Sequence, residues 1–149
     1  MEILKLINNG SKQLKDKNIY SYKLDSEILL SEALNQTREK TLINLNKRIE
    51  PKKINDYYRF IERRSSKEPI AYILKKKEFW SKNFLVDYNT LIPRPETELM
   101  VEKIVKIFKT KNISVLDIGT GTGCILLSIL SELKNSKGIG IDISSKAIQ

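Results

Sequence analysis

The 149-residue sequence predicts an α/β protein: a small N-terminal helical bundle, a β-hairpin, and the first strand–helix–strand unit of a Rossmann-type domain. Three patterns predict this fold. Apolar residues recur at helical spacing through residues 1–75, and two short β-favouring runs flank a polar loop within residues 76–90. In residues 91–149, glycines at alternate positions separate two further β-favouring runs. These ranges are the predicted helical domain, hairpin linker and incomplete Rossmann-type domain.

Four short helices are predicted in the helical domain. Asn9-Gly10 is expected to end the first helix, and Asp25-Ser26 can cap the second. Thr37 can open the third, and Pro51 suits the first turn of the fourth. The apolar residues expected to form the bundle core are Ile3, Leu4, Ile7 and Leu14; Ile28, Leu29, Leu30, Ala33 and Leu34; Leu42, Ile43 and Leu45; and Ile54, Tyr57, Tyr58 and Ile61.

The middle of the chain changes from helical to extended character. Phe79-Trp80 and Phe84-Leu85-Val86 flank the triplet Ser81-Lys82-Asn83. Two apolar runs around a short polar stretch predict a β-hairpin. We expect the polar triplet to be its loop.

A helix start follows the hairpin. Pro95 is suited to the first turn, and Glu96 and Glu98 fall where the helix dipole favours anions. The apolar face of this helix is predicted to be Leu99, Met100, Val101, Ile104, Val105 and Phe108. Helix-start chemistry does not account for Arg94 between two prolines, so we expect its side chain to be held in place.

The most informative stretch is a glycine-rich corner. A strand predicted over Val115–Ile118 leads into glycines at positions 119, 121 and 123, and a helix-compatible apolar run follows. Glycine tolerates positive φ and lets the backbone approach a ligand closely. A second predicted strand, residues 138–143, contains Asp142, which follows Gly123 by 19 positions. A Rossmann-type unit places a ribose-binding carboxylate at about this spacing.

The glycine spacing favours one nucleoside over others. A dinucleotide-binding turn has glycine at its sixth position, where this chain has Cys124. Alternating glycines preceded by Asp117 instead resemble the first motif of class I S-adenosylmethionine-dependent methyltransferases. Binding of NAD or FAD, and a tight corner without any ligand, remain the alternatives.

Composition limits the chemistry. The chain contains no histidine, so histidine acid–base catalysis and histidine metal sites are excluded, and we expect no metal. Its single cysteine, Cys124, excludes an internal disulfide and is expected to be a packing residue. No apolar run approaches 18 residues and no leader is recognisable, so we expect a cytoplasmic protein without a membrane span.

The net charge of +9 is unevenly placed. Residues 1–90 hold 19 basic against 12 acidic residues, and the remainder holds 8 against 6. The basic half could meet an acidic partner or make a weak contact with RNA. A solvated lysine-rich surface is the simpler interpretation.

Several strings together resemble one family. They are Glu68-Pro69-Ile70-Ala71-Tyr72, Lys77-Glu78-Phe79-Trp80, Leu91-Ile92-Pro93-Arg94-Pro95-Glu96-Thr97-Glu98 and Leu116-Asp117-Ile118-Gly119-Thr120-Gly121-Thr122-Gly123. The sequence is similar to the N-terminal portion of the HemK-type protein-(glutamine-N5) methyltransferases. The resemblance implies methylation of the glutamine amide in the Gly-Gly-Gln motif of peptide chain release factors. It further implies that the helical domain holds the release factor and the Rossmann-type domain holds S-adenosyl-L-methionine.

The resemblance also implies residue roles. The residues expected to line the cofactor are Gly119, Thr120, Gly121, Thr122 and Gly123. Asp142 would accept hydrogen bonds from the ribose hydroxyls. Arg94, Glu96 and Thr97 would lie near the cofactor pocket. No catalytic residue is assigned, because the family's Asn-Pro-Pro-Tyr loop does not occur in this sequence.

The absence of an Asn-Pro-Pro-Tyr string and a sheet of only two strands both lower the activity that we expect of this chain. A sheet of two strands would leave the edge of residues 113–118 unpaired and expose much of the helix at 125–133. We expect the chain alone to bind cofactor weakly and to transfer no methyl group. One alternative is an inactive fragment or binding module that docks a release factor or RNA. Another is a methyltransferase acting on RNA or a small molecule.

Overall fold

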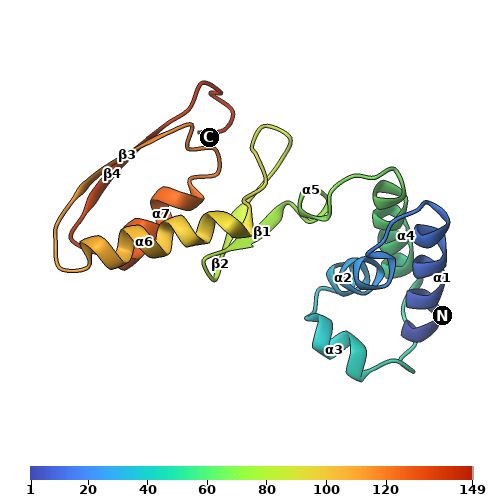
Figure 1. The fold of residues 1–149 in the computed structure, drawn as a ribbon. Coiled ribbons are helices and arrows are strands. Elements are labelled where there is room, and N and C mark those ends of the chain that lie inside the picture. The colour runs from blue at the N-terminus through green and yellow to red at the C-terminus, as the bar shows by residue number, and fades with distance from the viewer. Residues whose placement is uncertain (149) are drawn as a thin grey trace. The chain divides into compact units, whose positions relative to one another are not determined.

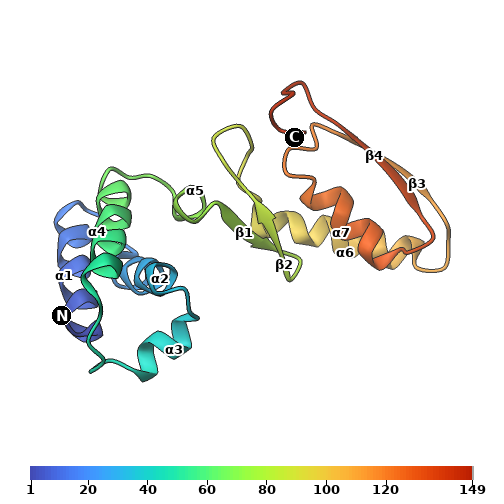
Figure 2. The same cartoon turned by 180° about the vertical axis from the view of Figure 1, so that it is seen from behind.

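The computed structural model describes residues 1–148, which form two compact units. The first unit is Met1–Leu74, and the second begins at Lys75. Each unit has its own cluster of buried apolar side chains and therefore a separate core. Figures 1 and 2 show the helices of the first unit and the mixed helices and strands of the second.

The first unit is entirely helical apart from one isolated bridge. Its helices are α1 (Ile3–Asp16), α2 (Tyr22–Leu34), α3 (Arg38–Ile43), α4 (Pro51–Ser65) and α5 (Ile70–Leu74). α1, α2 and α4 pack against one another and enclose the core. The buried core residues are Ile3, Leu6, Ile7, Leu14, Ile19, Leu29, Leu30, Ala33, Tyr57, Ile61 and Ile73.

The prediction that Asn9-Gly10 ends the first helix is wrong. α1 continues to Asp16, and Gly10 is buried in its interior. A Cβ at Gly10 would lie 1.8 Å from the phenolic oxygen of Tyr57, so the absence of a side chain at Gly10 leaves room for this tyrosine of α4. The predicted stripe also changes, because Leu4 is exposed and Leu6 is buried instead.

The second helix begins earlier than predicted, at Tyr22, so Asp25 and Ser26 do not cap it. Both side chains are buried and join α2 to other helices. Asp25 accepts a hydrogen bond from Arg64 Nε at 2.7 Å, and Ser26 Oγ donates to the carbonyl of Ile7 at 2.9 Å. Asp25 and Ser26, which the sequence suggested as caps, therefore make tertiary contacts instead.

The starts of the third and fourth helices are confirmed. Thr37 is the N-cap of α3, and its hydroxyl accepts a hydrogen bond from the amide of Lys40 at 3.3 Å. Pro51 is the first residue of α4. Tyr57 and Ile61 of that helix are fully buried, as its apolar spacing predicts.

The second unit combines two helices with two separate two-stranded sheets. Its elements are β1 (Lys76–Phe79), β2 (Lys82–Leu85), the 3₁₀ turn η1 (Pro95–Thr97), α6 (Glu98–Phe108), β3 (Ser114–Ile118), α7 (Cys124–Glu132) and β4 (Lys137–Ile141). Its core is Phe79, Phe84, Val101, Cys124, Ile129 and Leu133. Cys124 is buried at the start of α7, as expected for a packing residue.

The hairpin is confirmed, but its loop is not the predicted triplet. β1 and β2 pair antiparallel, with Phe79 opposite Lys82. The turn is therefore the two residues Trp80 and Ser81, whose φ angles are 51° and 55°. Two left-handed residues in succession define a type I′ turn, the geometry that matches the twist of a hairpin.

The parallel sheet pairs β3 with β4, with Leu116 opposite Ile139 and Ile118 opposite Ile141. α6 and α7 pack on each other, and α7 also contacts both strands. The four strand residues Leu116, Ile118, Ile139 and Ile141 are 45–75% exposed, on the sheet face opposite α7. The expectation that much of the helix at 125–133 is exposed is wrong. Leu126, Ser128, Ile129 and Leu133 are buried, and within this range only Leu127 and Glu132 are exposed.

Candidate functional site

The glycine corner joins the end of β3 to the start of α7. Gly119, Gly121 and Gly123 have φ angles of 77°, 52° and 71°, a region that other L-residues occupy at a cost. The amides of Gly119 and Thr120 both donate to the carbonyl of Ile141, at 2.8 and 3.0 Å. The corner is therefore fixed to the end of β4 by backbone hydrogen bonds.

The corner is open on the side that its first two glycines face. A Cβ built on Gly119 or Gly121 would have no atom within 4 Å. A Cβ on Gly123 would lie 3.3 Å from Leu127 Cδ1, within α7 itself. Gly119 and Gly121 therefore form a cradle bare of side chains, which a ligand could occupy against the backbone.

Asp142 lies directly after β4 and points toward this corner. Its Oδ2 accepts a hydrogen bond from the amide of Gly121 at 2.9 Å, and its Oδ1 accepts one from Ser144 at 2.9 Å. The amides of Ser144 and Gly121 hold the pKa of the Asp142 carboxyl below its ordinary value. The side chain is therefore ionised at neutral pH, and each oxygen keeps a free lone pair for a further donor.

Thr120 has a different position from the glycines. Its hydroxyl donates to Asp117 Oδ2 at 2.8 Å. A Cβ on Gly140 would lie 2.8–3.0 Å from the side chain of Thr120, so this threonine fills the space above β4. Thr120 and Asp117 thus stabilise the corner through this hydrogen bond, and the expectation that Thr120 also lines the cofactor stays a prediction.

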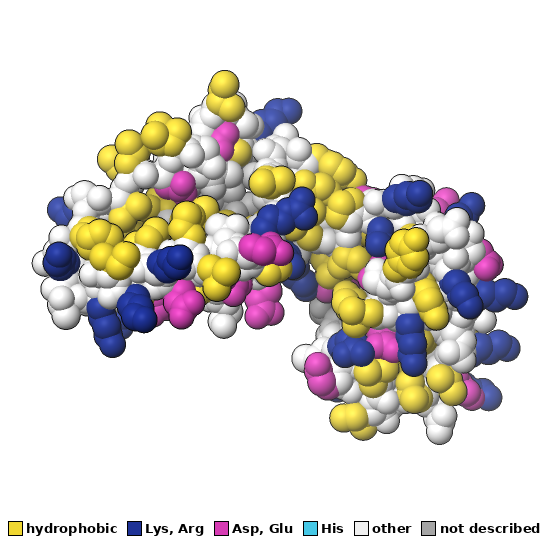
Figure 3. Space-filling view, in the orientation of Figure 1, with side chains coloured by type: hydrophobic (Ala, Val, Ile, Leu, Met, Phe, Trp, Pro, Cys, Tyr) yellow, Lys and Arg dark blue, Asp and Glu magenta, His cyan; other side chains and the backbone are white. Residues whose placement is uncertain are grey.

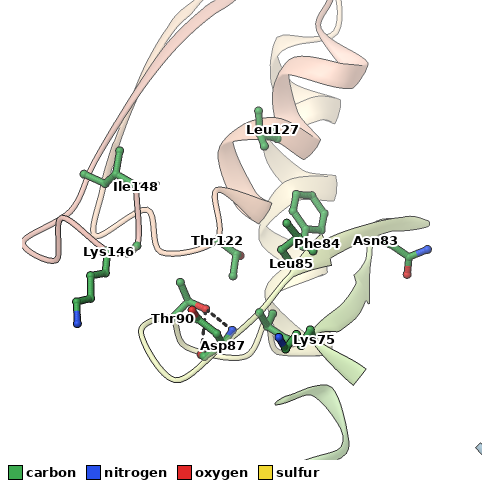
Figure 4. A pocket seen from close by; sticks show the side chains of 12 residues that line it. Lys75, Asn83, Phe84, Leu85, Asp87, Thr90, Thr122, Leu127, Lys146 and Ile148 are labelled. Atoms are coloured by element: carbon green, nitrogen blue, oxygen red, sulfur yellow. Dashed lines mark hydrogen bonds between the residues drawn. The ribbon is translucent and has the colours of Figure 1, made fainter. Parts of the chain in front are cut away.

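Thr122 lines a cavity of about 630 Å³ in the second unit. Its lining residues are Lys75, Asn83, Phe84, Leu85, Val86, Asp87, Thr90, Thr122, Leu127, Lys146, Ala147 and Ile148. Figure 4 shows Thr122 pointing toward the loop that carries Asp87 and Thr90. The amide of Asp87 donates to Thr90 Oγ1 at 3.4 Å, which ties the ends of this loop together. The volume of the cavity falls in the range of small-molecule sites.

The hairpin wall of this cavity was missed from the sequence. β2 and the loop after it contribute half of the lining, yet their residues read only as a hydrophobic strand. Arg94, Glu96 and Thr97 do not line the cavity. Arg94 is exposed and makes no described side-chain contact, so the expectation that it is held in place is wrong. The prolines on either side of Arg94 restrict the backbone there but do not constrain its side chain.

Two further kinds of feature are absent from residues 1–148. No group of three or more potential metal-binding side chains occurs there. No helix in this part of the chain is long and apolar enough to cross a membrane.

Known proteins resemble both units. Residues 5–74 match the family described as PrmC N-terminal domain, and residues 109–149 match a methyltransferase domain family. A release factor glutamine methyltransferase of Buchnera aphidicola subsp. Schizaphis graminum is 45% identical over 84% of this chain and 46% of its own length. Those of Leptospira interrogans and Buchnera aphidicola subsp. Acyrthosiphon pisum are 41% and 40% identical over 99% of the chain and 52% and 53% of their own lengths. The chain therefore spans about half the length of these relatives.

The glycine corner, the parallel strands and the matched domain define the second unit as part of a Rossmann-type methyltransferase domain. A helical domain precedes it in the sequence. The chain as a whole matches the N-terminal portion of the HemK-type family, the release factor glutamine methyltransferases, which confirms the resemblance found in the sequence.

Proposed function

We propose that this chain is part of an enzyme that transfers a methyl group from S-adenosyl-L-methionine to the glutamine side-chain amide in the Gly-Gly-Gln motif of peptide chain release factors. The relatives of 40–45% identity named release factor glutamine methyltransferase support this substrate. In this proposal the two units are the release-factor-binding and cofactor-binding domains.

The open glycine corner is the single observation that carries the proposal. S-adenosyl-L-methionine has no phosphate, so its pocket needs no lysine at the corner, and there is none. The bare backbone of Gly119 and Gly121 fits the cofactor's approach, and Asp142 fits its ribose diol as an ionised acceptor. Thr122 and Gly123 would complete the wall, with Thr120 holding the corner in shape.

The bound cofactor would supply an electrophilic methyl group on a sulfonium. An amide nitrogen is a weak nucleophile, so the protein contributes chiefly by alignment and by a preorganised electrostatic environment. In this chain the corner and Asp142 would hold one reactant in place. No residue here is assigned a proton-transfer role, and the sequence contains no Asn-Pro-Pro-Tyr string to orient the glutamine amide.

Calorimetric titration with S-adenosyl-L-methionine tests the cofactor assignment. Asp142→Ala should weaken binding about 10- to 100-fold, because hydrogen bonds to a charged acceptor contribute about 1.5–3 kcal/mol. Asp16→Ala removes an equal charge from the exposed end of α1 and should leave affinity unchanged. Equal affinity of the wild type and Asp142→Ala would refute the assigned role.

A second candidate is a binding module that docks a release factor without chemistry. The separate, closed core of the helical unit favours it, because that unit can hold a partner by itself. A tritiated-methyl assay with a release factor separates the candidates. Label on the Gly-Gly-Gln glutamine supports the enzyme, whereas binding without label supports the module; label on added RNA would support neither.

A further inference from the structure

Six lysines gather at one end of the second unit, which we call the lysine end. They are Lys103, Lys106, Lys109, Lys111, Lys134 and Lys137, and all are exposed. They lie in residues 102–113, which comprise most of α6 and the loop before β3, and in residues 132–137, which run from the end of α7 to the first residue of β4. These segments meet at the left end of the second unit in Figure 1, and Figure 3 shows dark-blue side chains there.

The lysine end carries the whole net charge of its unit. Only two carboxylates, Glu102 and Glu132, lie on these segments. The other six basic residues from residue 75 onward are balanced by six acidic ones. No described ion pair engages a lysine of this cluster; the described pairs join arginines to carboxylates in the first unit. The positive potential at this end is therefore not neutralised by neighbouring side chains.

A hollow of about 370 Å³ lies within the lysine end. Its lining is Lys109, Thr110, Lys111, Asn112, Glu132, Leu133, Lys134 and Asn135. Three ammonium groups, a hydroxyl and two amides can all donate hydrogen bonds to phosphate oxygens. The one acidic member, Glu132, already accepts a hydrogen bond from Trp80 Nε1 at 2.9 Å.

We propose that the lysine end binds the phosphate backbone of RNA without reading its sequence. Lysine acts on phosphate as a point charge, and the uncharged donors add contacts that carry no base information. A protein partner would need an apolar anchor at the centre of the interface. Ile107 is the one large apolar side chain described as exposed on these segments, so an acidic protein fits the surface less well.

RNA binding at this end is separate from the proposed cofactor site. The lysine end lies where β3 and β4 begin, whereas the glycine corner and Asp142 follow the residues at which these strands end. The inference thus goes beyond the proposed function and does not depend on it. Binding should occur without cofactor.

Fluorescence anisotropy with a labelled 12-nucleotide oligouridylate tests the proposal. Engagement of about four phosphates predicts a slope of about −3 for log affinity against log salt, since each phosphate contributes about −0.7 on a single strand. Between 50 and 200 mM KCl the affinity should then fall about 50-fold. No measurable binding at 50 mM KCl would overturn the proposal.

The triple variant Lys109→Gln, Lys111→Gln, Lys134→Gln locates the site. Its affinity should fall at least 10-fold and its salt slope should drop to about −1, because about one phosphate contact would remain. The control Lys5→Gln, Lys12→Gln, Lys52→Gln removes the same charge from exposed positions of the first unit and should bind within about two-fold of wild type.

Two outcomes would contradict the location or the ligand. An equal loss in both triple variants would show that binding follows net charge alone. Displacement of the RNA by poly-glutamate at equal charge concentration would indicate an acidic protein partner instead. Circular dichroism and melting of both variants should match the wild type, because all six side chains are exposed.

Discussion

Glycines in this chain have two distinct uses, and their surroundings decide which. At Gly119 and Gly121 the backbone needs a positive φ and the space beside it is empty. At Gly10 and Gly138 the backbone is ordinary, and a Cβ would collide with Tyr57 or Leu126. The first use leaves room for a ligand, and the second lets elements of the same unit pack closely.

Gly10→Ala should destabilise the helical unit, although alanine ordinarily stabilises a helix interior by about 0.5–1 kcal/mol. The new Cβ would displace the Tyr57 hydroxyl, which contacts Ser26 Oγ at 2.7 Å and donates to the Leu6 carbonyl at 3.1 Å. Burial raises the pKa of this phenol, so it remains a donor. Urea unfolding should show a loss of about 1–3 kcal/mol.

The matched double variant identifies the cause of that loss. In a Tyr57→Phe background the oxygen nearest to the new methyl group is gone. Gly10→Ala should then cost less than it does in the wild type, with a coupling free energy of about 0.5–3 kcal/mol. Additive effects would mean that the collision is not the reason.

Asp142 should make the stability of the second unit depend on pH. The amides of Ser144 and Gly121 lower the pKa of its carboxyl in the folded state, so the unfolded state binds the proton more tightly. Its contribution is present above the ordinary aspartate pKa of about 3.9 and is lost as pH falls through the folded value. The difference in unfolding free energy between wild type and Asp142→Asn should therefore be constant at neutral pH and shrink below about pH 4. A constant difference at all pH values would contradict this account.

At the scale of elements, the hairpin turn shows strain that a substitution can relieve. Trp80 and Ser81 are both left-handed, which costs a non-glycine residue about 1 kcal/mol or more. Trp80 is held by two contacts: its amide donates to Glu98 Oε1 and its indole to Glu132 Oε1, both at 2.9 Å. Ser81 has no described side-chain hydrogen bond that requires serine.

Ser81→Gly should stabilise the hairpin by about 1 kcal/mol, because glycine is favoured at the second position of a type I′ turn. Lys82→Gly, one residue later in β2, should instead destabilise by about 0.5–1 kcal/mol, since the strand is extended there. Thermal melting shows whether each variant is more or less stable than the wild type. Destabilisation by Ser81→Gly would argue against the type I′ geometry.

Elements were more predictable than their ends. The Pro51 start of α4, the Thr37 cap and the glycine corner were read correctly, because local chemistry decides them. The end of α1 and the start of α2 were misread, because distant partners decide them: Tyr57 explains Gly10, and Arg64 explains Asp25.

The site was predictable only in part for the same reason. Asp142 and the corner glycines come together as the strand–turn–helix pattern predicts. The hairpin wall of the cavity had no signal in the sequence, since it lines the same cavity as Thr122 only through tertiary packing. Thr120 could not be separated from its neighbours, because only the structure shows its contact with Asp117 and Gly140.

At the scale of the whole molecule, the chain has two cores rather than one. All buried residues of the first core lie between Ile3 and Ile73, and all those of the second lie between Phe79 and Leu133. Each unit is small enough for its stability to be marginal. The second also leaves the apolar side chains on one face of its parallel sheet exposed, and an exposed apolar patch of this kind favours association.

Two separate cores predict two unfolding transitions in a calorimetric scan of the full chain. Gly10→Ala should lower the midpoint of the helical unit alone, by about 4–8 °C for each kcal/mol lost. S-adenosyl-L-methionine should raise only the other midpoint, because a ligand stabilises the unit that binds it. Each transition can thus be assigned to one unit, because each perturbation should shift only one of the two midpoints. A single transition that both perturbations shift together would mean that the two units fold as one, and the division at Leu74 would then be wrong.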